Sequence, residues 1–244
     1  MIIRLNGALR LTGLAVLATS LAGCLGSGSG GNGGGGAGGG GGTTPPADAF
    51  AAYDSAFADA TANVLANAPT SDMPTSGQAS FSGQAKVEQV MNSDGSLAAD
   101  AILADINLGV TFGSGSSGTI TGTADNIRRS LDGKVETYDG VTLTTQYADS
   151  LSLPSTIATN TNTINVPGRG NITTRTGSYQ VNMAAPVTVQ DIPDLDADGD
   201  MLLTLGGTFT GAGAQGSFGT ASAQLFNGTV RAAGGSGTHY TKRD

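Results

Sequence analysis

From residue 77 onward, apolar side chains recur at every second position, and this period constrains the fold more than any other feature of the chain. The longest set is Ile102, Ala104, Ile106, Leu108, Val110 and Phe112. Other sets are Ala79, Phe81, Ala85 and Val87; Tyr179, Val181 and Met183; and Met201, Leu203, Leu205 and Phe209. Successive side chains of a strand point to opposite sides of a sheet, so each set predicts a strand with one buried face. Turn sequences such as Asn-Ser-Asp-Gly at 92–95 predict antiparallel pairing.

Glycines occur inside these predicted strands, for example at Gly207 and Gly211. Because glycine weakens a strand, its frequency needs a reason, and strong curvature at barrel corners supplies one. We therefore favour an all-β antiparallel barrel over a sandwich. A barrel that crosses the outer membrane shows the same alternation, but it carries girdles of aromatic residues, and this chain has seven Phe, five Tyr and no Trp.

Cys24 is the chain's one cysteine, and it follows Leu-Ala-Gly in the pattern of a bacterial lipoprotein signal. Arg4 and Arg10 give a positive start, and the mostly apolar segment 11–21 is too short to span a bilayer. We expect residues 1–23 to be a lipoprotein signal peptide and the thiol of Cys24 to be the lipidation site. An ordinary secretory peptide with an incidental cysteine is the weaker alternative.

Residues 24–46 are predicted to be the lipidated cysteine and a disordered, flexible tether. Residues 26–42 are 13 glycines with two serines, one asparagine and one alanine, a composition that neither buries surface nor fixes a backbone. Leu25 stands where aspartate would retain a lipoprotein at the inner membrane, so we expect the outer membrane. The tether favours display of a soluble body at the cell surface.

An amphipathic helix is predicted over residues 47–69, before the period changes to two. Asp48 is a suitable N-cap, and Pro69 limits the helix at its end. Its apolar stripe is Phe50, Tyr53, Phe57, Val64 and Leu65. The helix contains no lysine or arginine, so we expect it to pack on the β domain and not on an anionic membrane.

Three segments depart from the regular alternation. Residues 152–178 are rich in Ser, Thr and Asn, and we predict long loops there with one strand over 163–166. Residues 141–147 are predicted to form a strand, because Val, Leu and Tyr share one face. A change of parity at 225–226 predicts a β-bulge.

The formal charge of −8 excludes some partners. Loss of residues 1–23 lowers Lys plus Arg from 11 to 9 against 19 acids, which makes the charge −10. A protein this acidic repels phosphate backbones, so no nucleic-acid partner is expected. No disulfide is available to a chain with one cysteine. No catalytic triad, phosphate loop or zinc spacing is recognisable, so we do not expect an enzyme.

Three short motifs give the predicted barrel a family resemblance. They are Ala-Ser-Phe-Ser-Gly at 79–83, Gly-Thr-Ile-Thr-Gly at 118–122 and Gly-Thr-Phe-Thr-Gly at 207–211. With them, residues 77–244 resemble the barrel domain of transferrin-binding protein B-like and factor H-binding protein-like surface lipoproteins. The resemblance implies an eight-stranded barrel on a Gram-negative surface that binds an extracellular protein or a small solute, with iron or haem carriers among the candidates. It implies no particular ligand-binding residue.

The one cofactor that the sequence suggests is calcium. The candidate ligands are Asp194, Asp196, Asp198 and Asp200. They stand at positions one, three, five and seven of a calcium loop, with Gly199 at position six. Leu205 occupies position twelve, where a bidentate glutamate is expected, and the flanking segments are predicted strands. A solvated acidic turn without metal is therefore the favoured alternative.

His239 is the only histidine, and Tyr240 follows it. Both residue types ligate haem iron. A lone histidine near a chain end is more often a surface or edge-strand residue, and we expect that here.

Together these features predict a non-catalytic, lipid-anchored binding module, with its ligand held by loops at one end of the barrel. The alternative is a periplasm-facing structural lipoprotein that calcium stabilises and that has no external ligand.

Overall fold

The computed structural model describes residues 46–188, 198–227 and 230–244, with side chains from Phe50 onward. Cys24, the predicted signal peptide and most of the predicted tether lie outside the described residues. The helices are α1 (Pro46–Leu65) and α2 (Thr145–Ser150). The strands are β1 (Gln78–Asn92), β2 (Leu97–Thr111), β3 (Thr119–Leu131), β4 (Lys134–Thr137), β5 (Leu143–Thr144), β6 (Thr156–Val166), β7 (Gly170–Val187), β8 (Gly199–Thr210), β9 (Gly216–Asn227) and β10 (Val230–Arg243). In this part of the chain, no helix is long and apolar enough to cross a membrane.

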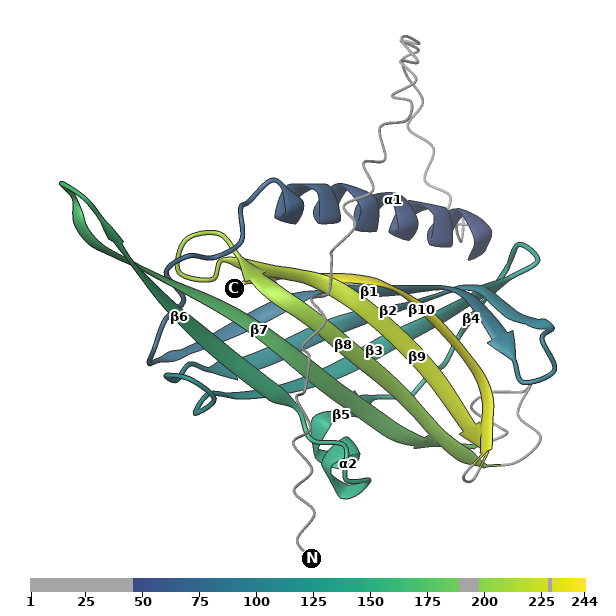
Figure 1. The fold of residues 1–244 in the computed structure, drawn as a ribbon. Coiled ribbons are helices and arrows are strands. Elements are labelled where there is room, and N and C mark those ends of the chain that lie inside the picture. Colours follow the sequence, from purple (N-terminus) through teal and green to yellow (C-terminus); the bar gives the residue numbers. More distant parts are fainter. Residues whose placement is uncertain (1–45, 189–197, 228–229) are drawn as a thin grey trace, which may run out of the picture. The chain divides into compact units, whose positions relative to one another are not determined.

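Eight strands close into an antiparallel ring, which confirms the predicted eight-stranded barrel with an N-terminal helix (Figure 1). Their order is β2–β1–β10–β9–β8–β7–β5–β3, and β3 pairs back with β2. β4 pairs with β3, and β6 pairs with β7. The ring is uneven because β5 has only two residues, which make two register pairs with β3 and one with β7.

The inside of the ring holds the main core, and the alternating apolar residues supply it. Phe209 is 1% exposed and lies at the centre of an aromatic cluster. Its ring centroid is 5.1 Å from that of Tyr179, 5.6 Å from that of Phe81 and 6.2 Å from that of Phe112. Burial of such large side chains is the main term that stabilises the fold.

Close approach of neighbouring strands explains two of the in-strand glycines. A Cβ at Gly83 would overlap the carbonyl oxygen of Tyr240, and one at Gly237 would overlap that of Lys86. Both glycines lie where β1 pairs with β10. Only a residue without a side chain allows the backbones to come this near, so close approach explains these two glycines.

Helix α1 lies across the outside of the barrel (Figure 1). Phe57 and Val64 pack on Leu103 and Tyr240, and the rings of Phe57 and Tyr240 meet edge-on with centroids 5.4 Å apart. The helix ends at Leu65 and not at the predicted residue 69. Four residues of the predicted stripe, Phe50, Tyr53, Phe57 and Val64, thus pack on the β domain, whereas the fifth, Leu65, is 54% exposed.

The prediction of long loops over residues 152–178 is wrong. β6 and β7 form a regular hairpin with eleven consecutive register pairs, from Thr156↔Gln180 to Val166↔Gly170. The part from residue 160 to residue 176, here called the outer ribbon, projects beyond the barrel (Figure 1). Because no side chain of the outer ribbon is buried, the sequence shows no apolar alternation there.

Two smaller predictions also need correction. The predicted strand over 141–147 ends at Thr144, whose hydroxyl caps α2 by accepting the backbone N–H of Tyr147 at 3.1 Å. The predicted bulge at 225–226 is absent from β9, which keeps an unbroken register with β8 up to Asn227. The irregularity lies in β10 instead, between Arg231 and Ala233.

Candidate functional site

A cavity of about 260 Å³ opens at one end of the barrel. This end, here called the barrel mouth, comprises the β1–β2 turn, the C-terminal part of β3, and the adjoining ends of β8, β9 and β10. Pockets that bury drug-sized ligands have volumes of roughly 300–1,000 Å³, so this cavity suits a smaller molecule.

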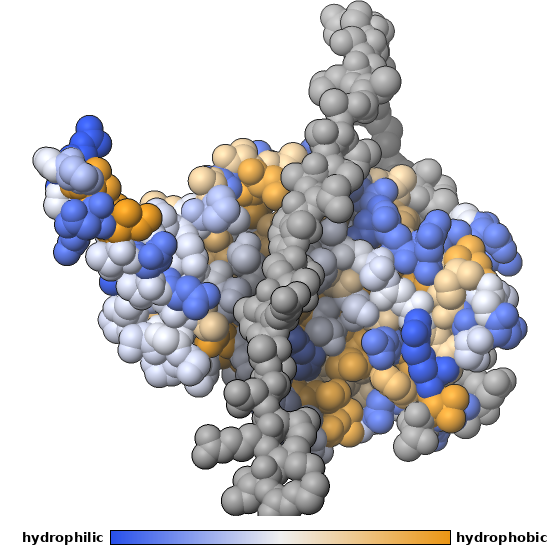
Figure 2. Space-filling model, viewed as in Figure 1, coloured by the Kyte–Doolittle hydropathy of each residue, from blue (hydrophilic) through white to orange (hydrophobic). Residues whose placement is uncertain are grey.

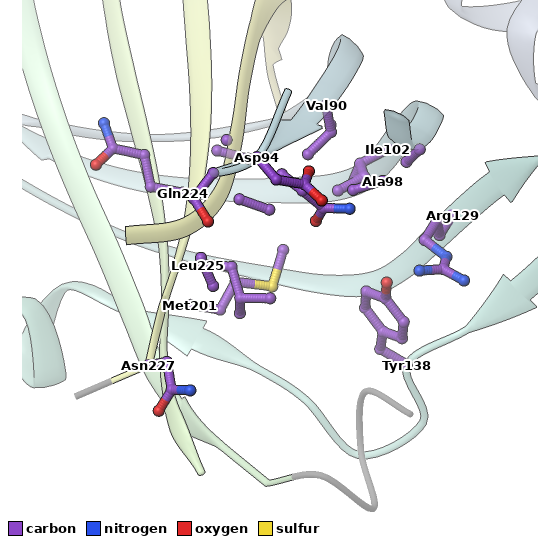
Figure 3. Close-up of a pocket in the computed structure, with 17 residues that line it drawn as sticks. Val90, Asp94, Ala98, Ile102, Arg129, Tyr138, Met201, Gln224, Leu225 and Asn227 are labelled. Carbon is purple, nitrogen blue, oxygen red and sulfur yellow. The ribbon is translucent and has the colours of Figure 1, made fainter. Parts of the chain in front are cut away.

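The walls of the cavity are about equally apolar and polar. The apolar part includes Val90, Ala98, Ala99, Ile102, Met201 and Leu225. Four of these, Val90, Ala99, Ile102 and Met201, also belong to the barrel core, so the core forms part of the cavity wall. Figure 3 shows Met201 and Leu225 on the wall opposite Arg129 and Tyr138. A ligand in this position would exchange water for apolar contacts.

Arg129 and Tyr138 give one wall of the cavity its polar character. Arg129 is only 8% exposed, and its Nη2 lies 2.9 Å from Oε2 of Glu136 on β4. Tyr138 follows β4 directly, and its backbone N–H donates to the carbonyl of Ile127 at 2.9 Å. The short β3–β4 hairpin thus positions both side chains on the same side of the cavity (Figure 3).

The rim on the opposite side is a preformed turn. Asp94 Oδ1 accepts the backbone N–H of Ser96 at 2.9 Å and its hydroxyl at 2.6 Å. These hydrogen bonds lower the pKa of the Asp94 carboxyl. The Asn92 side chain donates to the Ser96 hydroxyl oxygen at 3.0 Å and completes the turn.

None of the cavity residues was assigned to a site from the sequence, although one signal was available. Ile120 and Ala124 are buried on the inner face of β3. Asn126, with a φ of 50°, then shifts the parity, so that Ile127 and Arg129 are the buried residues. An arginine at an inward position, two residues after an isoleucine, indicates an interior polar site.

The predicted calcium ligands are only partly described by the structure. Asp194 and Asp196 lie outside the described residues, while Asp198 is exposed and Asp200 is half-buried at the start of β8. Asp200 Oδ1 accepts the Tyr147 hydroxyl at 2.7 Å, and this bond is the main cause of a raised pKa of Tyr147. Among the described residues, no group of three or more His, Cys, Asp or Glu side chains is placed to hold a metal ion.

His239 is fully buried, so the expectation of a surface or edge position is wrong. Its Nε2 lies 2.6 Å from the Tyr179 hydroxyl, and its Nδ1 lies 3.0 Å from the carbonyl oxygen of Thr220. The Tyr179 hydroxyl also lies 2.6 Å from that of Ser217. Burial lowers the pKa of His239 to about 4, so the ring is neutral at pH 7. This network satisfies polar groups within the core.

Comparison of the chain with protein families, curated proteins and solved structures gives no significant match. The fold defines the class as an antiparallel barrel covered by an external helix. Because one fold serves many functions, the function has to be argued from the site.

Proposed function

We propose that the chain is a lipid-anchored binding module of the bacterial outer membrane that holds a small solute with an apolar body and a polar group in the barrel mouth and performs no chemistry. The cavity at the barrel mouth carries this proposal. Mouths of β-barrels are frequent ligand sites, and an apolar pocket with a few polar groups is their usual composition. Arg129 and Tyr138 would orient one polar group of the solute, while its apolar body contacts Met201 and Leu225.

The location in this proposal depends on the sequence. The Leu-Ala-Gly-Cys pattern ending at Cys24, followed by Leu25 and a glycine run, supports lipidation and transfer to the outer membrane. Protease treatment of intact cells tests display at the surface. Loss of the barrel from intact cells supports it, whereas protection until the outer membrane is opened places the barrel in the periplasm.

Binding is tested with indole, a small apolar probe with one hydrogen-bond donor. We expect indole to raise the melting temperature of the chain, because a ligand of the folded state stabilises it. Ala99→Leu, which fills the cavity, should remove this effect. Ala158→Leu adds the same atoms on β6, away from the cavity, and should preserve it. Equal shifts in both variants, or no shift in the unmodified chain, contradict a solute site in the mouth.

A further inference from the structure

The outer ribbon has the properties of a sheet that lacks its neighbours. It is a two-stranded structure that projects beyond the barrel, and a two-stranded ribbon alone in water is marginally stable. The inner end of β6 is supported, because the backbone N–H of Thr159 donates to the carbonyl of Gly115 at 2.7 Å. From residue 160 to residue 166, no strand of the described chain pairs with the outer edge of β6.

This edge carries none of the devices that normally prevent edge-to-edge pairing. Such devices are charged residues, prolines and bulges. Residues 156–166 contain no charge and no proline, and their register with β7 has no shift. Alternate residues of an antiparallel edge direct their N–H and C=O groups outward, so the edge is a template for a further strand.

One face of the outer ribbon also carries an exposed apolar pair. Ile164 is 55% exposed and Ile172 is 45% exposed, and the two are direct cross-strand partners. Figure 2 shows hydrophobic residues on the projecting ribbon among hydrophilic ones. The opposite face is polar, with the Thr163 and Thr173 hydroxyl oxygens 3.0 Å apart and an Asn165–Asn171 hydrogen bond of 2.8 Å. An additional strand would extend the ladder and give the isoleucines neighbours.

We propose that this edge binds the same edge of a second copy, so that two outer ribbons form one four-stranded antiparallel sheet. Charge favours a second copy as the occupant. The chain is strongly acidic as a whole, but the β6 edge is neutral, so two copies meet here without placing like charges opposite each other. A twofold axis perpendicular to the sheet keeps both isoleucine pairs on the same face.

The symmetry fixes the register. A perpendicular twofold axis requires directly opposed residues to share a face, so the axis passes through a residue that faces its own copy. Centring the axis on Thr163 pairs all of residues 160–166 with the same segment of the second copy. Ile164 then lies opposite Asn162, and each apolar pair contacts the other copy.

The first test measures the mass of the full chain in solution as its concentration rises. We expect a monomer–dimer equilibrium that changes little with salt, because the paired edges are uncharged. Asn162→Lys places a charge on the edge and should weaken the dimer at least ~10-fold. Thr174→Lys is the matched control, because Thr174 is the cross-strand partner of Asn162 on β7 and lies away from the edge. It should change the dimer constant less than ~2-fold.

The second test uses a disulfide to report the register. In a chain with Cys24→Ser, Thr163→Cys supplies the only thiol and should form a covalent dimer on mild oxidation. Thr173→Cys, its partner on β7, should not. A chain that stays monomeric at every concentration overturns the proposal, as does equal weakening by the two lysine variants. Binding to anionic lipid vesicles through Ile164 and Ile172 without dimer formation also overturns it and assigns the ribbon to a membrane surface.

Discussion

The barrel and the outer ribbon are both antiparallel ladders, but their side chains have different surroundings. Strand β7 belongs to both parts. From Tyr179 to Val187 most of its side chains are buried, whereas none of residues 170–176 is buried. The backbone pairing with β6 and then β8 is regular in both stretches. Backbone hydrogen bonding in β7 therefore continues into the stretch where the side chains are no longer buried.

Backbone hydrogen bonding alone is enough to form a strand, but a strand can be recognised in a sequence only when burial of one face makes its apolar residues alternate. A period of two arises when one face is apolar and the other is polar. In the outer ribbon both faces meet solvent, and its strands contain mostly Thr and Asn. We therefore expect stability to concentrate in the barrel and self-association in the ribbon.

The largest expected effect tests the barrel side of this comparison. Phe209→Ala removes a ring that is 1% exposed and contacts three other aromatic rings. It should lower the free energy of unfolding by about 3–5 kcal/mol, measured by urea denaturation. Ile172→Ala removes an exposed side chain from the ribbon and should change it by less than about 0.5 kcal/mol. Comparable losses would mean that the ribbon contributes to the same core.

The buried histidine predicts a loss of stability in acid. Unfolded, His239 has a pKa of 6.5, and in the fold its pKa is about 4. As the pH falls below 6.5, His239 of the unfolded chain binds a proton, whereas His239 of the folded chain stays neutral until about pH 4. This group should therefore remove about 3 kcal/mol of stability across that window.

His239→Gln isolates this contribution, because the amide does not titrate. The variant and the unmodified chain share every carboxylate, so the difference between their stability–pH curves reports the histidine alone. The difference should be constant above pH 7 and shrink toward pH 4. A difference that is the same at every pH would show that His239 has the same pKa in the folded and the unfolded chain, and would contradict the prediction.

The strands with one buried face could be predicted from the sequence, whereas the strands of the solvated ribbon could not. The alternating sets identified β2, β7 and β8, and two of the in-strand glycines lie where neighbouring backbones approach closely. Residues 152–178 were assigned to loops, because a ladder with two solvated faces leaves no period. His239 was misplaced because its partners, Tyr179 and Thr220, are distant in sequence and meet only when the barrel closes. The cavity was missed for the same reason, since its walls come from six strands.

A smaller effect on stability is expected at β5, the two-residue strand of the ring. Thr144 ends β5 and caps α2 through its bond to the Tyr147 N–H. Thr144→Ala should cost about 1 kcal/mol in urea denaturation, whereas Thr144→Ser retains the cap and should cost less. Amide exchange at Tyr147 should become faster in the alanine variant alone. Unchanged exchange would show that β5 and α2 are held by packing on β7 and not by the cap.

The smallest effect on stability, and the most direct test of the comparison, comes from removing the ribbon. Replacing residues 163–173 by Asn-Gly joins Asn162 to Thr174, which are register partners, with a two-residue turn. It also keeps the backbone hydrogen bonds of Arg175 to Ser71 and Met73, at 2.8 and 3.0 Å.

The free energy of unfolding of this shortened chain should change by less than about 0.5 kcal/mol, because no buried side chain is lost. Indole binding should persist, because the barrel mouth lies elsewhere, while self-association should disappear. If the free energy of unfolding of the shortened chain falls by several kcal/mol, the stability of the barrel depends on the ribbon. The contrast between the buried and the solvated part of β7 would then not describe where stability resides.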